Sequence, residues 1–572
     1  SFWDCGEFIA AATKMQVGHQ PGAPFYLLIG KFFSLLALGN TAKIAYWVNF
    51  SAVVSSAFTI MFLFWTITAI LRKVYEKEKI SEKAFTIFIA GFIGALAYTF
   101  SDTFWFSAVE AEVYALSALF TAITFWAILK WERFLDDKWL IFISFIVGIS
   151  TGIHLLSLLV LPAITMFYYY RRTSKFTFWG MLKAFIAGCI LVGIVQFGML
   201  QYFVLTAAHF DRIFVNSFGF TFGSGALFFL FAFALAAILA IRYSILKNRY
   251  YLNLGLLCMV FLLFGFSSYF MIIIRADAKT SINLSNPDNP FSLYNYLGRT
   301  NYGSVPLMYG NTFDAKALEH QKTGNTYRKG EKQYEVSGNT YHSVYDKNLL
   351  FPRTFSQKPG HASFYKNWME LEDGQTPTLA QNLKFFATWQ VGVMYWRYFL
   401  WNFAGRQNDE QGYGDVVNGN WLSGIRPLDN LRLGDQSILP ESIRNNKGHN
   451  VFYSLPLILG IAGLFWLFKR DKNIGLILLT LFFSTGIAII IFINQDPLQV
   501  RERDYAYVGS FYVFAIFIGI GVLVIKDLMT RFLSSRISLI ATGIICFLSV
   551  PFIMGSRGWD DHDRSGKTTA LQ

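Results

Sequence analysis

Two carboxylates near the start of the chain have a spacing that could do acid–base chemistry. Asp4 and Glu7 stand three residues apart in a stretch that is expected to be helical, so both side chains project from one face. One carboxylate could take a proton from an acceptor hydroxyl while the other positions it. The alternative is structural, because Ser1-x-x-Asp4 also fits a helix-capping box and acidic residues are common at helix N-termini.

A second acidic group, Glu110 and Glu112 followed by Tyr114, stands where an apolar stretch begins. Charge at the edge of a membrane span is costly unless it is paired or functional, so these residues are candidates for substrate binding. The alternative is an exposed helix start that the helix dipole favours. His154, which follows another apolar stretch, is a further candidate, and a hydrogen-bonded turn residue is its alternative. No metal site is predicted, because no Cys or His stands at a ligand spacing.

Two arginines beside an expected helix N-terminus are typical of phosphate binding. Arg501 and Arg503 precede an apolar helix, where guanidinium forks and free backbone N–H groups both favour an anion. Tyr505, in the same motif RERDYAY, is a candidate for substrate binding. The competing interpretation is an internal salt-bridge network among Arg501, Glu502, Arg503 and Asp504.

Two further arginines could also meet a phosphate. Arg299 stands in YLGRTNYG and Arg406 in WNFAGR, and either could instead only cap a loop. The sequence has no Walker A, dinucleotide-binding, G-x-S-x-G or H-E-x-x-H motif, so nucleotide-driven chemistry has no visible site. These acidic residues and arginines suit a substrate whose tail stays in the bilayer while its phosphate head reaches the surface.

The elements that must position these residues are membrane helices. Hydrophobic residues make up 54% of the chain and charged residues 15%, whereas soluble proteins carry about a quarter charged residues. A spanning helix needs about 20 mostly apolar residues. The apolar run 22–38 begins with Pro and Gly and is expected to lie in the membrane interface, with a span as the alternative. Twelve spans are predicted, near 44–71, 84–100, 111–130, 139–153, 155–170, 178–206, 224–241, 252–274, 451–468, 473–494, 508–525 and 537–555.

The Lys and Arg residues predict the orientation of these spans. Six short loops on one side hold twenty of them, whereas the opposite short loops hold only Arg212, Arg501 and Arg503. Since positive loops stay in the cytoplasm, the segment 1–43, the loop 275–450 and the tail 556–572 are expected on the outer face. The same bias explains the net charge of +13 without a nucleic acid partner.

The predicted fold class is therefore an all-α polytopic membrane protein with a mixed insertion on its outer face. The predicted organisation is an outer acidic-motif segment 1–43, a bundle 44–274, the outer loop 275–450, helices 451–555 and a tail 556–572. Within the loop, the aromatic stretch 385–403 is expected to be a helix at the membrane interface, and a thirteenth span is the alternative. The four cysteines offer neither a disulfide framework nor a zinc cluster.

Several long motifs resemble one family. The opening SFWDCGEFIAAATKMQVGHQPGAPFYLLIGKFF, with AVEAEVYALS, GIHLLSLLVLP, YLGRTNYGSVP, MYWRYFLWNFAGR, RERDYAYVGSFY and WDDHDRSG, is similar to a membrane glycosyltransferase family abundant in Bacteroidetes and long of unknown function. Animal relatives include a transmembrane O-mannosyltransferase that acts on receptor ectodomains. The sequence has His-Gln-Pro-Gly, with Gln20 in the second position, where His-Pro-Pro-Gly is expected for the family. This departure should leave the chemistry intact.

The resemblance implies a bundle of the GT-C class, with about twelve spans visible, a first span missing before residue 1 and a chain that continues past residue 572. It also implies a sugar donor carried on polyprenyl phosphate. Asp4, assisted by Glu7, would deprotonate a Ser or Thr hydroxyl of an exported protein, and Arg501 or Arg503 would stabilise the leaving phosphate. No cofactor or metal would be required. The expected location is the bacterial inner membrane, with the active site on the periplasmic face.

Two rival functions remain open at this point. The acceptor could be a lipid or a surface glycan instead of a protein, because fold-level analogy does not settle a substrate. A lipid or solute transporter is the second rival. It should carry ionisable or helix-breaking residues near mid-span, whereas most charges here stand at span ends.

Overall fold

The computed structural model describes residues 3–76, 78–173, 175–303 and 305–562. The predicted capping residue Ser1 and the end of the WDDHDRSG motif lie outside these ranges. The chain divides into two compact units built from separate stretches. Unit 1 holds residues 1–55, 110–304 and 317–344, and unit 2 holds residues 56–109, 305–316 and 345–572.

The protein is an all-α polytopic membrane protein. Among the described residues, nine helical stretches are long and apolar enough to span a membrane. They are Thr41–Val74, Ile80–Thr99, Val113–Phe134, Phe178–Phe218, Ser224–Leu246, Tyr250–Asp277, Lys472–Ile493, Asp504–Met529 and Ser535–His562.

Each of the nine stretches overlaps a predicted span, and the other three predicted spans form shorter helices. These three are α7 (Lys138–Thr151), α8 (Leu161–Arg172) and α20 (Leu455–Arg470). The apolar run 22–38 contains α2 (Pro24–Leu35), whose 12 residues rise about 18 Å, less than the ~30 Å of a bilayer core.

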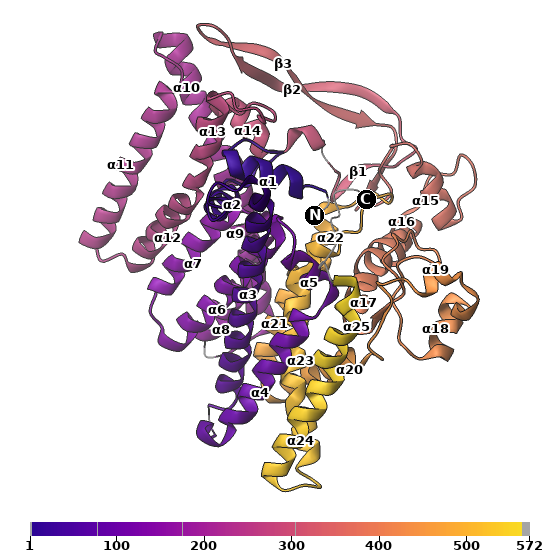
Figure 1. The fold of residues 1–572 in the computed structure, drawn as a ribbon. Coiled ribbons are helices and arrows are strands. Elements are labelled where there is room, and N and C mark those ends of the chain that lie inside the picture. The colour runs from indigo at the N-terminus through magenta and orange to yellow at the C-terminus, as the bar shows by residue number, and fades with distance from the viewer. Residues whose placement is uncertain (1–2, 77, 174, 304, 563–572) are drawn as a thin grey trace. The chain divides into compact units, whose positions relative to one another are not determined.

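Unit 1 contains most of the predicted N-terminal bundle and a long exposed hairpin (Figure 1). Its hairpin pairs β2 with β3, and helix α3 starts in this unit and continues into unit 2. Besides α2, α7 and α8, its elements are α1 (Cys5–Lys14), η1 (Thr41–Lys43), α3 (Ile44–Val74), α6 (Val113–Phe134), η2 (Leu155–Val160), α9 (Phe178–Gly193), η3 (Ile194–Phe203), α10 (Val204–Phe218), α11 (Ser224–Leu246), α12 (Tyr250–Phe266), η4 (Ser267–Tyr269), α13 (Phe270–Asp277), α14 (Pro290–Leu297), η5 (Thr300–Tyr302), β2 (Ala317–Lys329) and β3 (Tyr334–Tyr345).

Close helix packing in unit 1 depends on small residues, as is usual inside membranes. α7 and α12 lie against each other where Gly148 faces Gly265. A Cβ at Gly148 would stand 2.1 Å from the carbonyl oxygen of Leu262, so only glycine allows this approach. α6 crosses the unit as its most buried span, with 78% of its apolar window covered.

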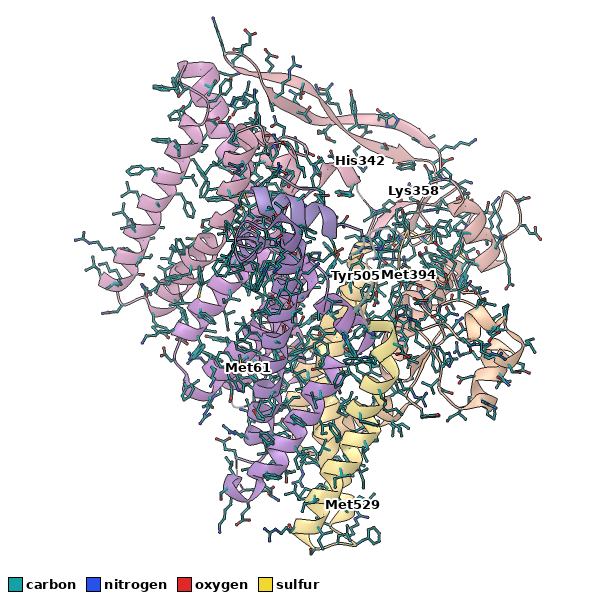
Figure 2. The ribbon with its side chains drawn as sticks, in the orientation of Figure 1. Met61, His342, Lys358, Met394, Tyr505 and Met529 are labelled. Carbon is teal, nitrogen blue, oxygen red and sulfur yellow. The ribbon has the colours of Figure 1, made fainter. Side chains whose placement is uncertain are left out.

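Unit 2 is built around one buried helix, α23, and also carries the short strand pairs β1–β4 and β5–β6. Figure 2 shows its side chains, with Met529 at the C-terminal end of α23. Besides α20, its elements are α4 (Ile80–Thr99), α5 (Asp102–Ala108), β1 (Tyr309–Asn311), β4 (Asn348–Leu350), α15 (His361–Met369), α16 (Leu379–Phe385), η6 (Phe386–Trp396), α17 (Arg397–Phe403), β5 (Gly405–Arg406), α18 (Arg426–Leu433), η7 (Gln436–Ile438), α19 (Glu441–Arg444), β6 (Asn450–Val451), α21 (Lys472–Ser484), α22 (Ile487–Ile493), η8 (Asp504–Tyr507), α23 (Val508–Met529), α24 (Ser535–Phe547), η9 (Leu548–Phe552) and α25 (Ile553–His562).

Helix α23 packs against α4, α20, α21 and α24. Glycines again bring the backbones together, because a Cβ at Gly463 of α20 would stand 1.9 Å from the carbonyl oxygen of Phe517. The most apolar part of the span Asp504–Met529, which contains α23, is 83% buried, so α23 forms the core of this unit.

The aromatic stretch 385–403 is helical, as predicted, and its middle part is the π-helical segment η6. It packs inside unit 2, where Phe399 and Phe403 contact the ring of Phe514 with centroids 4.8 and 4.7 Å away. Two polar residues of this stretch, Gln390 and Arg397, are 0% and 5% exposed. Their burial requires polar partners on other elements of the unit.

Candidate active site in unit 1

The first carboxylate pair lies at the N-terminus of α1. Asp4 is the N-cap residue of this helix, and its carbonyl oxygen accepts a hydrogen bond from the backbone N–H of Phe8 at 2.9 Å. Its side chain makes no capping hydrogen bond to this helix, and the alternative of a capping box with Ser1 lies outside the described residues. Glu7 lies in the first turn, on the same side as Asp4.

Glu7 forms an ion pair with His19. Oε1 of Glu7 lies 3.0 Å from Nδ1 of His19 and accepts the backbone N–H of the same residue at 2.7 Å. Burial alone would raise the pKa of Glu7, but the hydrogen bonds and charge of His19 lower it below its ordinary value. The hydrogen bond to Glu7, with the charges of Glu7 and Asp4, raises the pKa of His19 against burial. The pairing therefore favours the carboxylate form of Glu7 and the protonated form of His19.

The loop after α1 is fixed by three elements of the same unit. Arg275 of α13 donates through Nε to the carbonyl oxygen of Met15 at 2.5 Å, which satisfies an otherwise orphaned carbonyl at the helix end. The hydroxyl of Tyr296 on α14 donates to the carbonyl oxygen of Gly18 at 2.6 Å. A Cβ at Gly18 would stand 2.7 Å from Oε1 of Glu7, so this position has no room for a side chain. The Glu7–His19 pair thus has a rigid support.

Arg299 adds an exposed positive charge to this site. It follows α14 in the left-handed conformation, with φ of 54°, and its guanidinium lies 4.8 Å from the ring centre of Tyr302. Its charge acts on both His19 and His154, which places it near these two rings. Of the four arginines predicted to bind phosphate, Arg299 is the one that lies in unit 1, and its charge reaches His19, the partner of Glu7.

The second acidic group lies beside α1 as well. Cys5 is completely buried, and its thiol donates to Oε1 of Glu112 at 3.9 Å. Glu112 is the N-cap residue of α6 and is 4% exposed. One ligand atom each from Cys5, Glu110 and Glu112 lies within 4.8 Å of the others. Cys5 is therefore part of the second acidic group.

His154 serves as a turn residue in this site. Its Nδ1 accepts the backbone N–H of Leu156 at 3.2 Å, which requires an unprotonated Nδ1, and its ring lies 5.3 Å from the ring of Tyr114. Burial, with the charges of Arg299 and His19, lowers the pKa of His154 to about 4. The imidazole is neutral at pH 7, so it can donate a hydrogen bond to a substrate through Nε2 but cannot pair with a phosphate.

Two sets of side chains in unit 1 have the spacing of cation ligands. Asp4, Glu7 and His19 form one set, and Cys5, Glu110 and Glu112 form the other, each with three ligand atoms within 4.8 Å of one another. Carboxylate and imidazole ligands suit Zn²⁺ or Mn²⁺. In the first set, however, the nitrogen of His19 that faces the carboxylates is already paired with Glu7.

An apolar cavity lies beside α14, the helix whose Tyr296 holds the loop after α1. Its volume is about 480 Å³, and α10, α11, α12, α13 and α14 contribute to its wall. Leu293 of α14 lines it, one turn before Tyr296 on the same helix. Such a cavity accepts an alkyl or isoprenoid chain.

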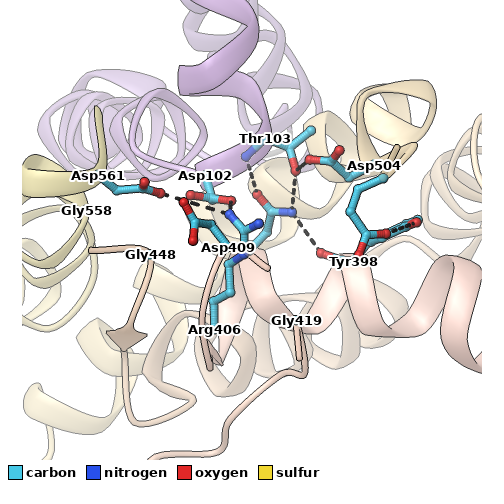
Figure 3. Close-up of polar contacts among 12 residues, drawn as sticks. Asp102, Thr103, Tyr398, Arg406, Asp409, Gly419, Gly448, Asp504, Gly558 and Asp561 are labelled. Carbon is cyan, nitrogen blue, oxygen red and sulfur yellow. Dashed lines mark hydrogen bonds and ion pairs between the residues drawn. The ribbon is translucent and has the colours of Figure 1, made fainter. Parts of the chain in front are cut away.

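The other candidate residues belong to unit 2. The side chain of Arg406 is 11% exposed and pairs with Asp102, with Nη1 2.8 Å from Oδ2, so its guanidinium is already engaged by a carboxylate (Figure 3). Arg501 lies over the ring of Tyr505, 4.6 Å from its centre. Nε of Arg503 is buried and has no hydrogen-bond partner among the described residues.

The salt-bridge network suggested for 501–504 takes a different form. Glu502 forms a bidentate pair with Arg397, with nitrogen–oxygen distances of 2.9 and 2.7 Å. Asp504 accepts the hydroxyl of Thr103 at 2.6 Å. Both acids of the motif are therefore used to join η8 to other elements of unit 2.

Sequence reasoning missed His19, Tyr296 and Cys5 as parts of the site. His19 stands in the motif VGHQPG, twelve residues after Glu7, and no helical or strand period links these two positions. Only its residue type could have indicated a role, because His19 is an ionisable residue in a turn that follows the helix with Asp4 and Glu7. Tyr296 gave no signal, since a tyrosine on an apolar helix face is ordinary.

Comparisons with known proteins match the part of the chain that contains the two acidic groups, His19 and His154. Residues 4–177 match a family model described as the protein O-mannosyl-transferase TMEM260 N-terminal domain. Residues 303–387 match a family of unknown function, DUF8416. Protein O-mannosyl-transferase tmem260 of Dictyostelium discoideum is 24% identical over 120 residues, which are 21% of this chain and 13% of that relative. No solved structure matches the chain.

Proposed function

We propose that this protein is an inverting glycosyltransferase of the GT-C class. It moves a sugar from a polyprenyl-phosphate donor to Ser or Thr hydroxyls of exported proteins, on the periplasmic face of the bacterial inner membrane. The observation that carries the proposal is the group formed by Asp4, Glu7, His19 and Arg299 in unit 1. The match of residues 4–177 to an O-mannosyl-transferase domain supports it, because that match includes both acidic groups.

The group separates a proton acceptor from a cationic side. Glu7 is committed to His19 and keeps that ring protonated, so Glu7 is a positioning residue. Asp4 remains as the general base. A ring nitrogen of His19 lies within 4.8 Å of a carboxylate oxygen of Asp4, and the charge of Arg299 acts on the same ring, so the two cations can stabilise a phosphate beside Asp4.

The reaction is a single displacement at the anomeric carbon. The carboxylate of Asp4 takes the proton of the acceptor hydroxyl, and the oxygen forms a bond to the anomeric carbon. The bond from that carbon to the phosphate oxygen breaks, and the electron pair leaves with polyprenyl phosphate. Arg299 and the imidazolium of His19 stabilise the charge that develops on the phosphate. Attack opposite the leaving group inverts the anomeric configuration.

The apolar cavity supports a lipid-linked donor. Because Leu293 in its wall and Tyr296 at the loop after α1 share α14, an isoprenoid chain in the cavity would keep the phosphate near this helix. Arg501 and Arg503 stay predictions from the sequence, and we propose them as further phosphate contacts to be tested separately.

A reconstituted transfer assay tests the proposal. The full-length protein in liposomes would receive polyprenyl-phosphate mannose and an exported Ser/Thr-rich acceptor, with sugar nucleotides as the comparison donor. We expect mannose on the protein acceptor from the lipid-linked donor alone. Sugar transfer to a lipid or a glycan, without transfer to the protein, would show that the acceptor is not a protein. No sugar transfer from the lipid-linked donor would contradict the proposal.

A further inference from the structure

A second group of titratable side chains lies in unit 2 and has no part in the proposed reaction. Asp102 at the start of α5 meets Asp561 and His562 at the end of α25, and one ligand atom from each lies within 4.8 Å of the others. Figure 3 shows Asp102 and Asp561 beside Arg406. The side chains of Asp102, Asp561 and His562 are 5%, 11% and 1% exposed. The ring of Trp105 stacks on His562 at 4.6 Å and covers it.

Negative charge exceeds positive charge in this group. Nη1 of Arg406 lies 2.8 Å from Oδ2 of Asp102 and 4.0 Å from Oδ2 of Asp561. The charges of Asp504 and Asp409 also act on the same guanidinium. One arginine therefore faces two largely buried carboxylates, those of Asp102 and Asp561, and unbalanced charge is costly in such a setting.

One oxygen of Asp102 has no hydrogen-bond partner among the residues that the structure describes. Its Oδ2 is paired with Arg406, whereas its Oδ1 is buried and accepts no hydrogen bond. Nε2 of His562 lies 3.5 Å from this Oδ1 and 3.2 Å from the carbonyl oxygen of Asp102. A buried carboxylate oxygen without a donor requires either a proton or a cation.

The orientation of His562 favours a cation. Nδ1 of this ring lies 2.8 Å from the carbonyl oxygen of Gly558, one helical turn earlier, which assigns the proton to Nδ1. Nε2 then presents a lone pair to two oxygens that are also acceptors. Metal-bound histidines almost always donate their other ring N–H to a carbonyl or carboxylate in this way.

The distances match those around a small metal ion. Bonds of about 2.0–2.1 Å to a tetrahedral Zn²⁺ place neighbouring ligands roughly 3.3–3.4 Å apart. The separations of 3.2 and 3.5 Å between Nε2 and the two oxygens of Asp102 bracket this value.

We infer that Asp102, Asp561 and His562 bind a divalent transition-metal cation of the zinc type. The ion is structural: it joins the end of α25 to the start of α5 and neutralises the excess carboxylate charge beside Arg406. The site is separate from the carboxylates of unit 1 and does not depend on the proposed reaction.

Zinc binding to the full-length protein in detergent tests this inference. After treatment with a chelator, the protein would be titrated with Zn²⁺, and bound metal and the melting temperature would be measured. We expect wild type to bind one equivalent more than Asp561→Asn and His562→Gln, and to melt higher with zinc. Replacing a metal ligand should weaken the site at least about 10-fold, since even an outer partner is worth 10–100-fold. Asp560→Asn, an exposed carboxylate next to the site, is the matched control and should bind as wild type does.

Two further measurements keep the test decisive. The metal-free Asp561→Asn variant should melt no lower than metal-free wild type, because it removes one of the excess carboxylates, which also shows that it folds. The one-equivalent difference should persist in a Glu7→Gln background, which separates it from the ligand set of unit 1. Equal zinc binding by wild type and both site variants would overturn the inference and would mean that a proton on His562 occupies the position.

Discussion

The bidentate ion pair between Arg397 and Glu502 should be worth several kcal/mol to the fold of unit 2. The two side chains are 6% and 15% exposed, so solvent screens the pair little. Oε2 of Glu502 also accepts the hydroxyl of Tyr398 at 2.6 Å, and Oε1 accepts the backbone N–H of Gly412 at 3.0 Å. Replacing Glu502 by Gln keeps the shape and removes the charge that compensates Arg397.

Breaking a buried pair by removing one partner costs about 3–5 kcal/mol, because the other charge stays buried without compensation. We expect this loss for Glu502→Gln and for Arg397→Met. The double variant should lose less than the sum of the two, with a coupling of roughly 2–3 kcal/mol for groups in contact. The exposed pair of Arg328 and Glu335, at 2.9 Å with side chains 69% and 42% exposed, is the matched control. Glu335→Gln should change stability by less than about 1 kcal/mol.

Stability would be measured as the free energy of unfolding in mixed detergent micelles, followed by tryptophan fluorescence. Acid should mimic the Glu502→Gln variant. Burial alone would raise the pKa of Glu502, but Arg397 and the hydrogen bonds lower it. The stability from the pair is therefore present above the unfolded-state pKa and is lost as the pH falls through the lowered pKa. Single variants within about 1 kcal/mol of wild type, or additive losses, would refute this reasoning.

Three further predictions concern the site in unit 1. The rate of sugar transfer should fall at alkaline pH, as His19 loses its proton above its raised pKa. The rate should also fall at acid pH, as Glu7 gains a proton below its lowered pKa. His19→Gln should remove the alkaline limb of the pH–rate profile. Gly18→Ala places a Cβ 2.7 Å from Oε1 of Glu7 and should lower the rate at least about 10-fold, since small displacements of catalytic groups are costly. Gly193→Ala is the matched control, because a Cβ at Gly193 would meet open space. Equal transfer rates in the Gly18→Ala and Gly193→Ala variants would show that the loop tolerates the side chain. Arg299→Gln should lower the rate about 100-fold, with partial recovery in Arg299→Lys, and equal rates in all three proteins would remove Arg299 from the phosphate site.

The helices and the first carboxylate pair could be predicted from the sequence because both follow from local patterns. Apolar runs of about 20 residues predict spans, and nine of the twelve predicted spans are helices of sufficient length. The i, i+3 spacing of Asp4 and Glu7 holds at the start of α1. The exceptions α7, α8 and α20 are shorter because polar or glycine-containing turns end them, and hydropathy averages over such turns.

The partners of the candidate residues could not be predicted in the same way. Arg406 was expected at a phosphate, but it pairs with Asp102, 304 positions earlier in the chain. Glu502 was expected to pair with its sequence neighbours, but it pairs with Arg397 from the aromatic helix. The burial of Arg397 is possible only with that partner, and a single sequence contains no signal for contacts at such separation. His19 is a milder case, since its residue type was visible and only its distance to Glu7 was not.

Sugar transfer by an Asp4→Asn variant tests the central claim most directly. Full-length wild type, Asp4→Asn, Glu7→Gln and the surface control Asp136→Asn would be reconstituted together and supplied with polyprenyl-phosphate mannose and a protein acceptor. The account predicts that the folded Asp4→Asn protein loses transfer by about 100-fold or more while Asp136→Asn retains it, as expected for the loss of a general base. Glu7→Gln should lose transfer with a shifted alkaline limb, because His19 no longer has its partner. Wild-type rates in Asp4→Asn would contradict the account and would move the base to Glu110 or Glu112.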